Sequence, residues 1–246
     1  MRSSEESAST DTPIVIDLTS KLLQRQSHDI PQTRKSQNLL RGSVLLIFIV
    51  SILFNAYICF RYFARDWHTW EGASFFGKTA LGAITICIHW VGGFLVNICG
   101  CIQMLPEIRH KYPAVHRASG RMYLFGAFLA SIGGFIYIIA MGTVGGLQMD
   151  TAFGIYGVLI FICCCQVIYH IRKPVPDIVQ HSNWAIRLFM LGIGSALYRV
   201  YVLPLLMGYF VDHAITYLNI CGWLMFVPNI FIAEIIIRFR NTSSIK

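Results

Sequence analysis

The sequence predicts an all-α fold, a polytopic membrane helical bundle of about six transmembrane helices in which two repeated helical hairpins form a four-helix core. Of the 246 residues, 55% are hydrophobic and 13% are charged, and the mean hydropathy is +0.58. An ordinary soluble domain carries many more charges. These charges are also segregated, which leaves uncharged stretches long enough to cross a bilayer as helices. The third observation is an internal repeat.

The repeat consists of two polar turns, residues 103–126 and 166–192, each of which joins one apolar segment to the next. In both turns a Gln, an Arg, a Pro, a His, a second Arg and a Gly follow in the same order. The pairs are Gln103/Gln166, Arg109/Arg172, Pro113/Pro176, His116/His181, Arg121/Arg187 and Gly126/Gly192. We interpret them as two parallel hairpin repeats whose turns lie on the same side of a membrane.

The domain organisation follows from where the apolar segments begin and end. Residues 1–41 are polar and rich in Ser and Thr, which predicts a disordered cytosolic tail. The transmembrane domain is expected over 42–240, and 241–246 form a short C-terminal tail. The six spans are predicted at 42–60, 80–104, 122–142, 152–169, 188–210 and 220–237.

The polar residues within the spans distinguish them from one another. The first span has Asn55 as its strongly polar interior residue and is expected at the periphery of the bundle. In the second, His89, Gly93 and Asn97 share one helical face, which must face protein or a cavity rather than lipid. The third carries small residues at close-packing spacing, which predicts a contact with another helix. These are Gly126, Ala130, Gly133 and Gly134.

The formal net charge of +8 is explained by orientation in a membrane. With six spans and an inner N-terminus, the outer side holds only Arg61, Arg65 and Lys78. Apart from Arg199 within a span, the other Lys and Arg residues fall on the inner side. This asymmetry predicts cytosolic N- and C-termini and attraction to anionic lipids of the inner leaflet. No nucleic-acid partner is expected. The eight cysteines fall in or beside the spans without CxxC spacing, and we interpret them as packing residues.

His116 and His181 are the repeat-related histidines at the inner surface. Two imidazoles from facing hairpins could hold a haem b iron, with Arg121 and Arg187 binding its propionates. A lipid phosphate or a quinone head group would use the same donors. The alternative is that both histidines are polar residues at helix starts, at the headgroup boundary. His170 is a substitute ligand at the same level.

Arg199 and His89 are the ionisable residues predicted deepest in the bilayer. A charged Arg there needs carbonyls, Asn97, water or an anionic ligand. His89 could form an interhelical hydrogen bond, ligate haem or handle protons. Because the two residues belong to a similar depth, they could share one site. Glu234 in the sixth span is expected to pair with Arg187 or Arg238.

These motifs resemble the integral-membrane family known as domain of unknown function 2306. The resemblance covers residues 80–237 and rests on His89, on the run from Arg109 to Tyr123, and on a later group. That group is His181, Trp184, Arg187 and Arg199, with Ala185 where the family usually has Met. The resemblance implies a membrane protein but no settled activity. The helix number and histidine-bearing hairpins are also similar to cytochrome-b-type membrane proteins.

Three function classes follow from these residues. The first is an electron carrier or oxidoreductase with haem b at His116 and His181. The second is a non-catalytic binder or transporter for an anion, a proton or a lipid headgroup, centred on Arg199. The third is a structural accessory subunit. Whether the protein is an enzyme is not decided by the sequence, and its small-residue stripes are compatible with homo-oligomers.

Overall fold

The computed structural model describes residues 34–58 and 79–243. The predicted disordered tail lies outside them up to residue 33, and its last residues, 34–41, are helical because they form the first turns of α2. The predicted outer loop, residues 61–78, also lies outside them. Within the described residues the fold is all helical, as predicted. The helices are α2 (Arg34–Ile58), α4 (Ala80–Met104), α5 (Pro106–Lys111), α6 (Pro113–Met141), α7 (Gly146–Arg172), α8 (Ile178–Gly192), α9 (Gly194–Leu206), the 3-10 helix η2 (Val211–His213), α10 (Ala214–Leu224) and α11 (Val227–Ser243).

Five helical segments in the described residues are long and apolar enough to cross a membrane. They are Ala80–Met104, Pro113–Met141, Gly146–Arg172, Ile178–Leu205 and Val211–Thr242, whereas the apolar helix Arg41–Tyr57 is shorter than these. Several helices extend beyond the uncharged stretches of the sequence. Charged residues are tolerated there because long Lys and Arg side chains near helix ends place their charges in the headgroup region and keep their aliphatic stems in the apolar layer.

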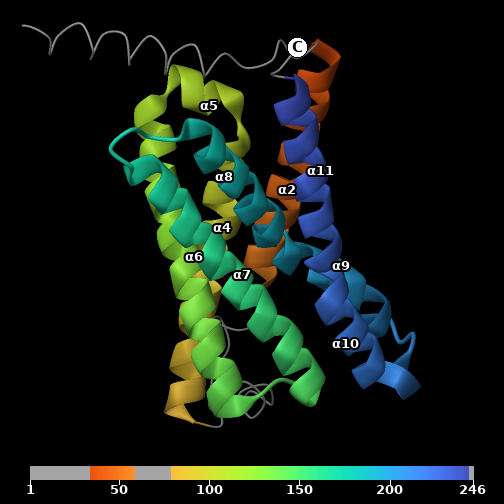
Figure 1. The fold of residues 1–246 in the computed structure, drawn as a ribbon. Coiled ribbons are helices and arrows are strands. Elements are labelled where there is room, and N and C mark those ends of the chain that lie inside the picture. Colours follow the sequence, from red (N-terminus) through yellow and green to blue (C-terminus); the bar gives the residue numbers. More distant parts are fainter. Residues whose placement is uncertain (1–33, 59–78, 244–246) are drawn as a thin grey trace, which may run out of the picture.

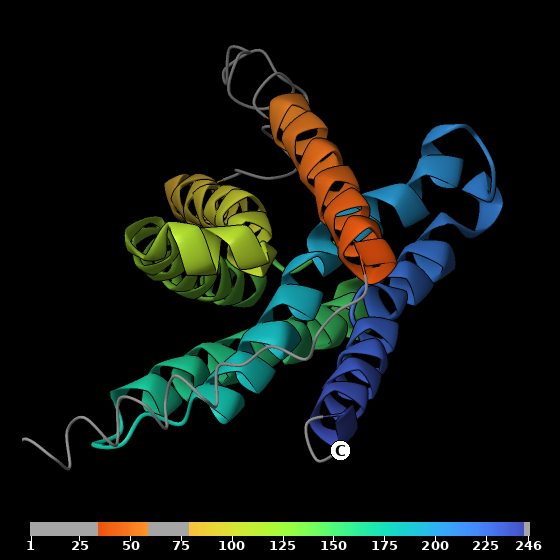
Figure 2. The ribbon, with the colours of Figure 1, turned by 90° about the horizontal axis from the view of Figure 1, so that it is seen from above.

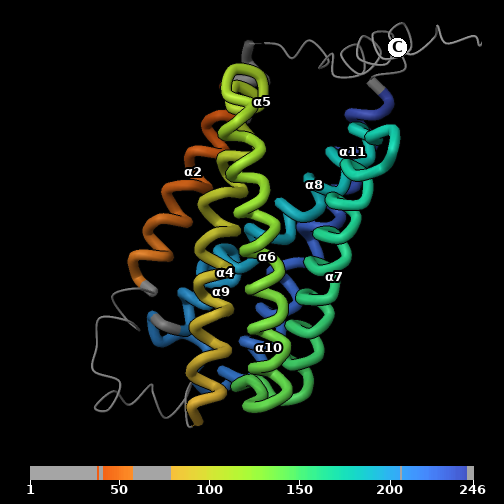
Figure 3. Tube along the Cα trace, turned by 90° about the vertical axis from the view of Figure 1, so that its left-hand side faces the viewer, coloured from red at the N-terminus to blue at the C-terminus, as the bar shows by residue number. Residues whose placement is uncertain are grey.

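The chain passes back and forth along the bundle (Figure 1). α2 runs away from the end that carries α5, α4 returns to it, and the later segments alternate in the same way until α11 finishes at that end again. We call this end of the bundle the α5 end. The turn between α7 and α8 lies there too, so the two predicted hairpins turn at the same end, as Figure 3 also shows. Their equivalence as a repeat stays a prediction.

Four helices form a ring in which each contacts the next, in the order α4, α6, α7, α8 and back to α4. α6 and α8 are therefore diagonally opposed, and both run away from the α5 end (Figure 1). α2 packs on α4 and α9, and α11 packs on α8. Figure 2 shows α2 and α11 outside the α4–α6 pair. The polytopic bundle that the sequence predicts is thus observed.

α4 and α6 are in backbone contact through glycines. A Cβ atom on Gly92 would overlap the carbonyl oxygen of Gly126 and the amide nitrogen of Ala130. A Cβ on Gly133 would lie 2.8 Å from the amide nitrogen of His89. Glycine allows this approach because it has no side chain to separate the two backbones. The small-residue stripe therefore makes the helix contact that the sequence predicts.

The last two predicted spans are interrupted, which the sequence did not predict. The helix breaks between α8 and α9 at Ile193, and between α10 and α11 at Met225 and Phe226. A Cβ on Gly194 would lie 2.7 Å from the carbonyl oxygen of Met225, so the two breaks meet. Broken backbone within a bilayer needs new hydrogen-bond partners. Asn229 supplies one, because its Nδ2 donates to Met225 O at 2.8 Å.

Candidate functional site

His116 lies in the first turns of α6, which starts at Pro113. Proline suits this position because the first helical amide has no partner to lose. Gln103, at the end of α4, fixes this turn: its Nε2 donates to His116 O at 2.8 Å and to Ser119 Oγ at 2.6 Å. The backbone of His116 is thereby held against α4.

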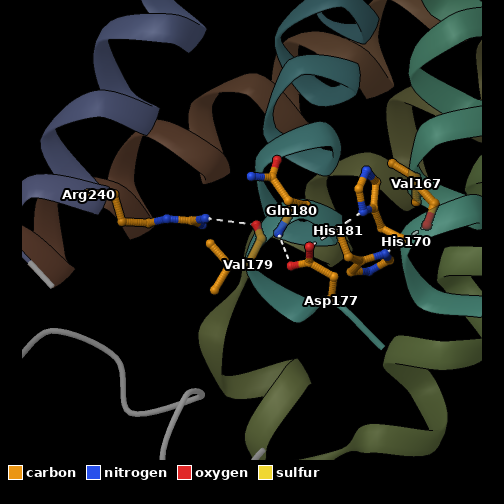
Figure 4. Close-up of polar contacts among 7 residues, drawn as sticks. All are labelled: Val167, His170, Asp177, Val179, Gln180, His181 and Arg240. Carbon is orange, nitrogen blue, oxygen red and sulfur yellow. Dashed lines mark hydrogen bonds and ion pairs between the residues drawn. The ribbon is translucent and has the colours of Figure 1, made fainter. Parts of the chain in front are cut away.

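His181 lies in the first turn of α8, which Asp177 caps. The Asp177 carboxylate accepts a hydrogen bond from the backbone amide of Gln180 at 2.9 Å. The Nδ1 atom of His181 lies 3.0 Å from the carbonyl oxygen of Val167 in α7 (Figure 4). This contact fits a ring that is protonated at Nδ1, which presents the lone pair of Nε2 to a ligand.

The structure places His116 and His181 at the same end of the bundle, each near the start of its helix. The two imidazoles lie within electrostatic range of each other, and Arg109 lies within range of His116. The Nδ1 atom of His116 is buried without a hydrogen-bond partner among the described residues. A buried ring nitrogen of this kind is costly unless it binds something. The pair is therefore the best candidate site at the α5 end.

The two arginines predicted beside this pair differ in their surroundings. Arg187 forms a bidentate ion pair with Glu234, at 2.6 Å from Nε and 3.1 Å from the second terminal nitrogen. Its guanidinium also stacks 4.4 Å from the centre of the Trp184 ring. The predicted pairing of Glu234 is thus confirmed for Arg187. Arg121 is exposed on α6.

Two residues of this region were missed at the sequence level. Asp177, besides capping α8, lies 3.7 Å from Nδ1 of His170. Arg240, near the end of α11, bonds to Ser182 Oγ and Asn183 Oδ1 and lies 3.4 Å from Val179 O (Figure 4). An acid just before a helix is a cap signal that could have identified Asp177. No sequence signal joins Arg240 to α8.

Basic residues gather at the α5 end. Among the described residues, every Lys and Arg except Arg199 lies toward that end. Glu107 of α5 forms an ion pair with Arg41 of α2. The pKa of Glu107 is lowered, mainly because its carboxylate accepts from its own backbone amide and then from Arg41. The charge distribution is the one that the sequence predicts for an inner face.

His89 and Arg199 lie together in the opposite half of the bundle. His89 Nδ1 is 2.7 Å from the carbonyl oxygen of Ala130, which confirms the predicted interhelical hydrogen bond. Arg199, on α9, lies within electrostatic range of His89 and stacks 5.1 Å from the ring centre of Phe54. Arg199 is nearer the end of its span than expected, because that segment ends at Leu205 rather than at residue 210.

Asn97 is the polar residue of α4 whose side chain lacks hydrogen bonds at both of its polar atoms, among the described residues. The residue is 4% exposed, and neither its amide nitrogen nor its amide oxygen has a hydrogen-bond partner among the described residues. Leaving such groups unpaired is expensive inside a bilayer. The described residues contain no group of three or more His, Cys, Asp or Glu side chains that could hold a metal ion.

Comparison with known proteins gave one match. The family model described as "Predicted membrane protein (DUF2306)" matches residues 86–237, which is more than half of the chain. The matched region includes the His116/His181 pair on α6 and α8 and the His89/Arg199 pair on α4 and α9. A search of curated proteins found no match. A search of solved structures found none either.

Proposed function

The chain belongs to the DUF2306 family of predicted membrane proteins, and we propose that it carries electrons through one b-type haem held between His116 and His181. The proposal is supported by two imidazoles on diagonally opposed helices that lie within electrostatic range of each other. Haem iron takes two axial ligands on opposite faces of its ring. Helices on opposite sides of a four-helix ring can supply one ligand each.

The residues around the pair fit such a group. Histidine ligands usually donate their second ring nitrogen to a carbonyl, as the contact of His181 with Val167 allows. The unpartnered Nδ1 of His116 is suited to a ligand role. When bound, the haem supplies one-electron chemistry, while the protein sets its position and its surroundings. The analogy with cytochrome-b-type membrane proteins is part of this proposal.

Arg121 and Arg109 are the arginines we assign to the haem propionates. Arg109 lies within electrostatic range of His116, and Arg121 is exposed on the same helix as His116. Arg187, the other expected partner, already binds the carboxylate of Glu234. A propionate would have to displace that carboxylate, so we assign Arg187 to holding α8 against α11. A quinone or lipid headgroup would meet the same basic residues.

The haem proposal predicts a spectrum. The protein purified in detergent from haem-replete cells should show a Soret band, with sharp α and β bands after reduction by dithionite. His116→Ala and His181→Ala should each lose most of these bands, because one axial ligand is missing. His213→Ala is the matched control, since His213 lies in η2 at the opposite end of the bundle and should leave the spectrum unchanged.

A spectrum of the wild-type protein without haem bands would contradict this function. The same holds if both histidine variants keep the wild-type bands. If those variants change only the unfolding temperature of a haem-free protein, His116 and His181 are structural and the accessory-subunit alternative is favoured.

We also propose that the α5 end faces the cytosol, so that both termini are cytosolic. The concentration of Lys and Arg at that end supports this orientation. An Asn-X-Ser sequon in a lengthened connection between α9 and α10 should then be glycosylated in microsomes. The same insertion between α7 and α8 should stay unmodified. The reverse pattern would refute the proposed orientation.

A further inference from the structure

The two interrupted spans break at the same level of the bundle. α8 ends at Gly192 and α9 begins at Gly194, while α10 ends at Leu224 and α11 begins at Val227. The close approach of Gly194 to the carbonyl oxygen of Met225 puts the two breaks in contact. A hinge needs only a few residues that change φ and ψ. Two breaks side by side can therefore act as one hinge for everything beyond them.

The part beyond the breaks is a helical hairpin made of α9, η2 and α10, which we call the α9–α10 hairpin. It lies at the end of the bundle opposite the α5 end (Figure 1). The hydroxyl of Tyr217 in α10 donates to Tyr201 O in α9 at 2.7 Å. The ring of Phe210 stacks on that of Tyr217, with 4.8 Å between the ring centres. These contacts brace the hairpin internally, so it can move as one body.

The α9–α10 hairpin packs on the four-helix ring mainly through the contact of α10 with α7. A Cβ atom on Gly222 of α10 would lie 3.7 Å from the Cβ of Ala152 in α7. Tyr198 of α9 contacts the Phe153 ring edge-on, at 5.6 Å between ring centres. The buried Oδ1 of Asn219 in α10 accepts no hydrogen bond from the described residues. Small and apolar surfaces of this kind can slide past each other.

Tyr156 of α7 occupies the break between α8 and α9. Its hydroxyl donates to Leu191 O, on the α8 side, at 2.8 Å. The same hydroxyl is in hydrogen-bonding range of the backbone amide of Ser195, on the α9 side. In a continuous helix this amide would bond directly to Leu191 O, four residues earlier. The Tyr156 hydroxyl is thus inserted into the helical ladder, which is an established cause of helix kinks.

The hydroxyl of Tyr123 on α6 lies beside the same break without a partner. Tyr123 is 4% exposed, and its hydroxyl forms no hydrogen bond among the described residues. A Cβ atom on Gly192 would lie 3.2 Å from its oxygen, and Tyr123 is within electrostatic range of Tyr156. A buried hydroxyl without a partner raises the free energy of the folded state. An arrangement that pairs it would recover this cost.

We infer that α8 and α9 form a two-state hinge that the Tyr156 hydroxyl switches. In the observed state this hydroxyl stands between Leu191 O and the Ser195 amide. In the second state it pairs with the Tyr123 hydroxyl, and the Ser195 amide donates directly to Leu191 O. Both states contain two hydrogen bonds, so neither is strongly disfavoured.

The consequence of the switch is a movement of the α9–α10 hairpin. When the helix closes between Leu191 and Ser195, the kink is lost and the hairpin swings about the paired breaks. The four-helix ring stays in place, and so does the proposed haem site at the α5 end. The hinge is therefore a property of the fold beyond the proposed electron carrier.

The test measures the distance between α6 and the α9–α10 hairpin in the full chain, reconstituted in lipid nanodiscs. Spin labels on noncanonical residues at Ile139 and Ile215 leave the native cysteines in place, and both positions are exposed. Double electron–electron resonance should show two distance populations. Tyr156→Phe should raise the ratio of the second population to the first by about tenfold, because two hydrogen bonds of the first state are lost.

Tyr123→Phe should change this ratio in the opposite direction, by a similar factor, because the second state loses its hydroxyl partner. The matched control is Tyr217→Phe, which removes a hydrogen bond of the same kind inside the hairpin and should leave the ratio unchanged. Labels at Leu81 and Phe125, both exposed on the ring helices α4 and α6, should give one distance in every variant.

The inference is overturned if the wild type and Tyr156→Phe share one distance, or if both tyrosine variants shift the ratio in the same direction. Should Tyr156→Phe fail to fold, Ser195→Pro decides the point. Proline has no amide hydrogen to close the helix, so the second population should disappear, and its persistence would refute the hinge. The distances are measured with or without haem, so a failure of the proposed electron carrier is seen separately.

Discussion

Gly92→Ala is expected to destabilise the protein by about 3 kcal/mol, near the upper end of the usual cost of overpacking. The added methyl group would overlap the carbonyl oxygen of Gly126 and the amide nitrogen of Ala130. These are backbone atoms of α6, so no side-chain rotation can make room. α4 and α6 would have to separate along their whole contact, and the hydrogen bond between His89 and Ala130 would lengthen.

Gly154→Ala is the matched control for this substitution. Gly154 lies within α7, and a Cβ atom there would meet nothing within 4 Å. Alanine is the better helix former, so this variant should be neutral or more stable by up to about 1 kcal/mol. Unfolding in mixed micelles with increasing dodecyl sulfate measures both. Equal stability of the two variants would contradict the backbone contact between α4 and α6.

The contact between α4 and α6 could be predicted because its signal is local. Gly126, Ala130, Gly133 and Gly134 recur on one face of one helix, and periodicity alone shows this. The same reasoning placed His89 on a polar face of α4 that must meet protein or a cavity. Sequence periodicity does not predict the helix breaks at Ile193 and Met225, because the close approach of Gly194 to Met225 joins residues that are distant in sequence.

Some residues of the candidate sites could be predicted from the sequence and others could not, for the same reason. His116 and His181 could be paired because their turns match in order and spacing, and the structure places them within electrostatic range of each other. Tyr156 gave no signal, because its hydrogen bond to Leu191 joins residues that are distant in sequence. α2 was expected at the periphery of the bundle, and it packs on α4 and α9 outside the four-helix ring.

Glu234→Gln is expected to destabilise the protein by about 1–3 kcal/mol, less than for a fully buried ion pair because the Glu234 side chain is 37% exposed and its charge is partly screened by solvent. Glu234 accepts two hydrogen bonds from Arg187 and joins α11 to α8. The neutral amide keeps the shape of the side chain but leaves the Arg187 charge beside Trp184 without its counter-charge. Arg187→Gln should cost a similar amount.

The double variant Arg187→Gln/Glu234→Gln should recover much of this loss, because neither charge is then left alone. A double-mutant cycle measured by dodecyl sulfate unfolding should give a coupling free energy of about 1–3 kcal/mol. The control cycle is Arg41→Gln with Glu107→Gln, an ion pair in which Arg41 is 53% exposed, and its coupling should be below about 1 kcal/mol. If the Arg187–Glu234 coupling is no larger than that of the control, the pair does not hold α11 against α8. Arg187 would then be available for a propionate, and its assignment away from the haem site would be wrong.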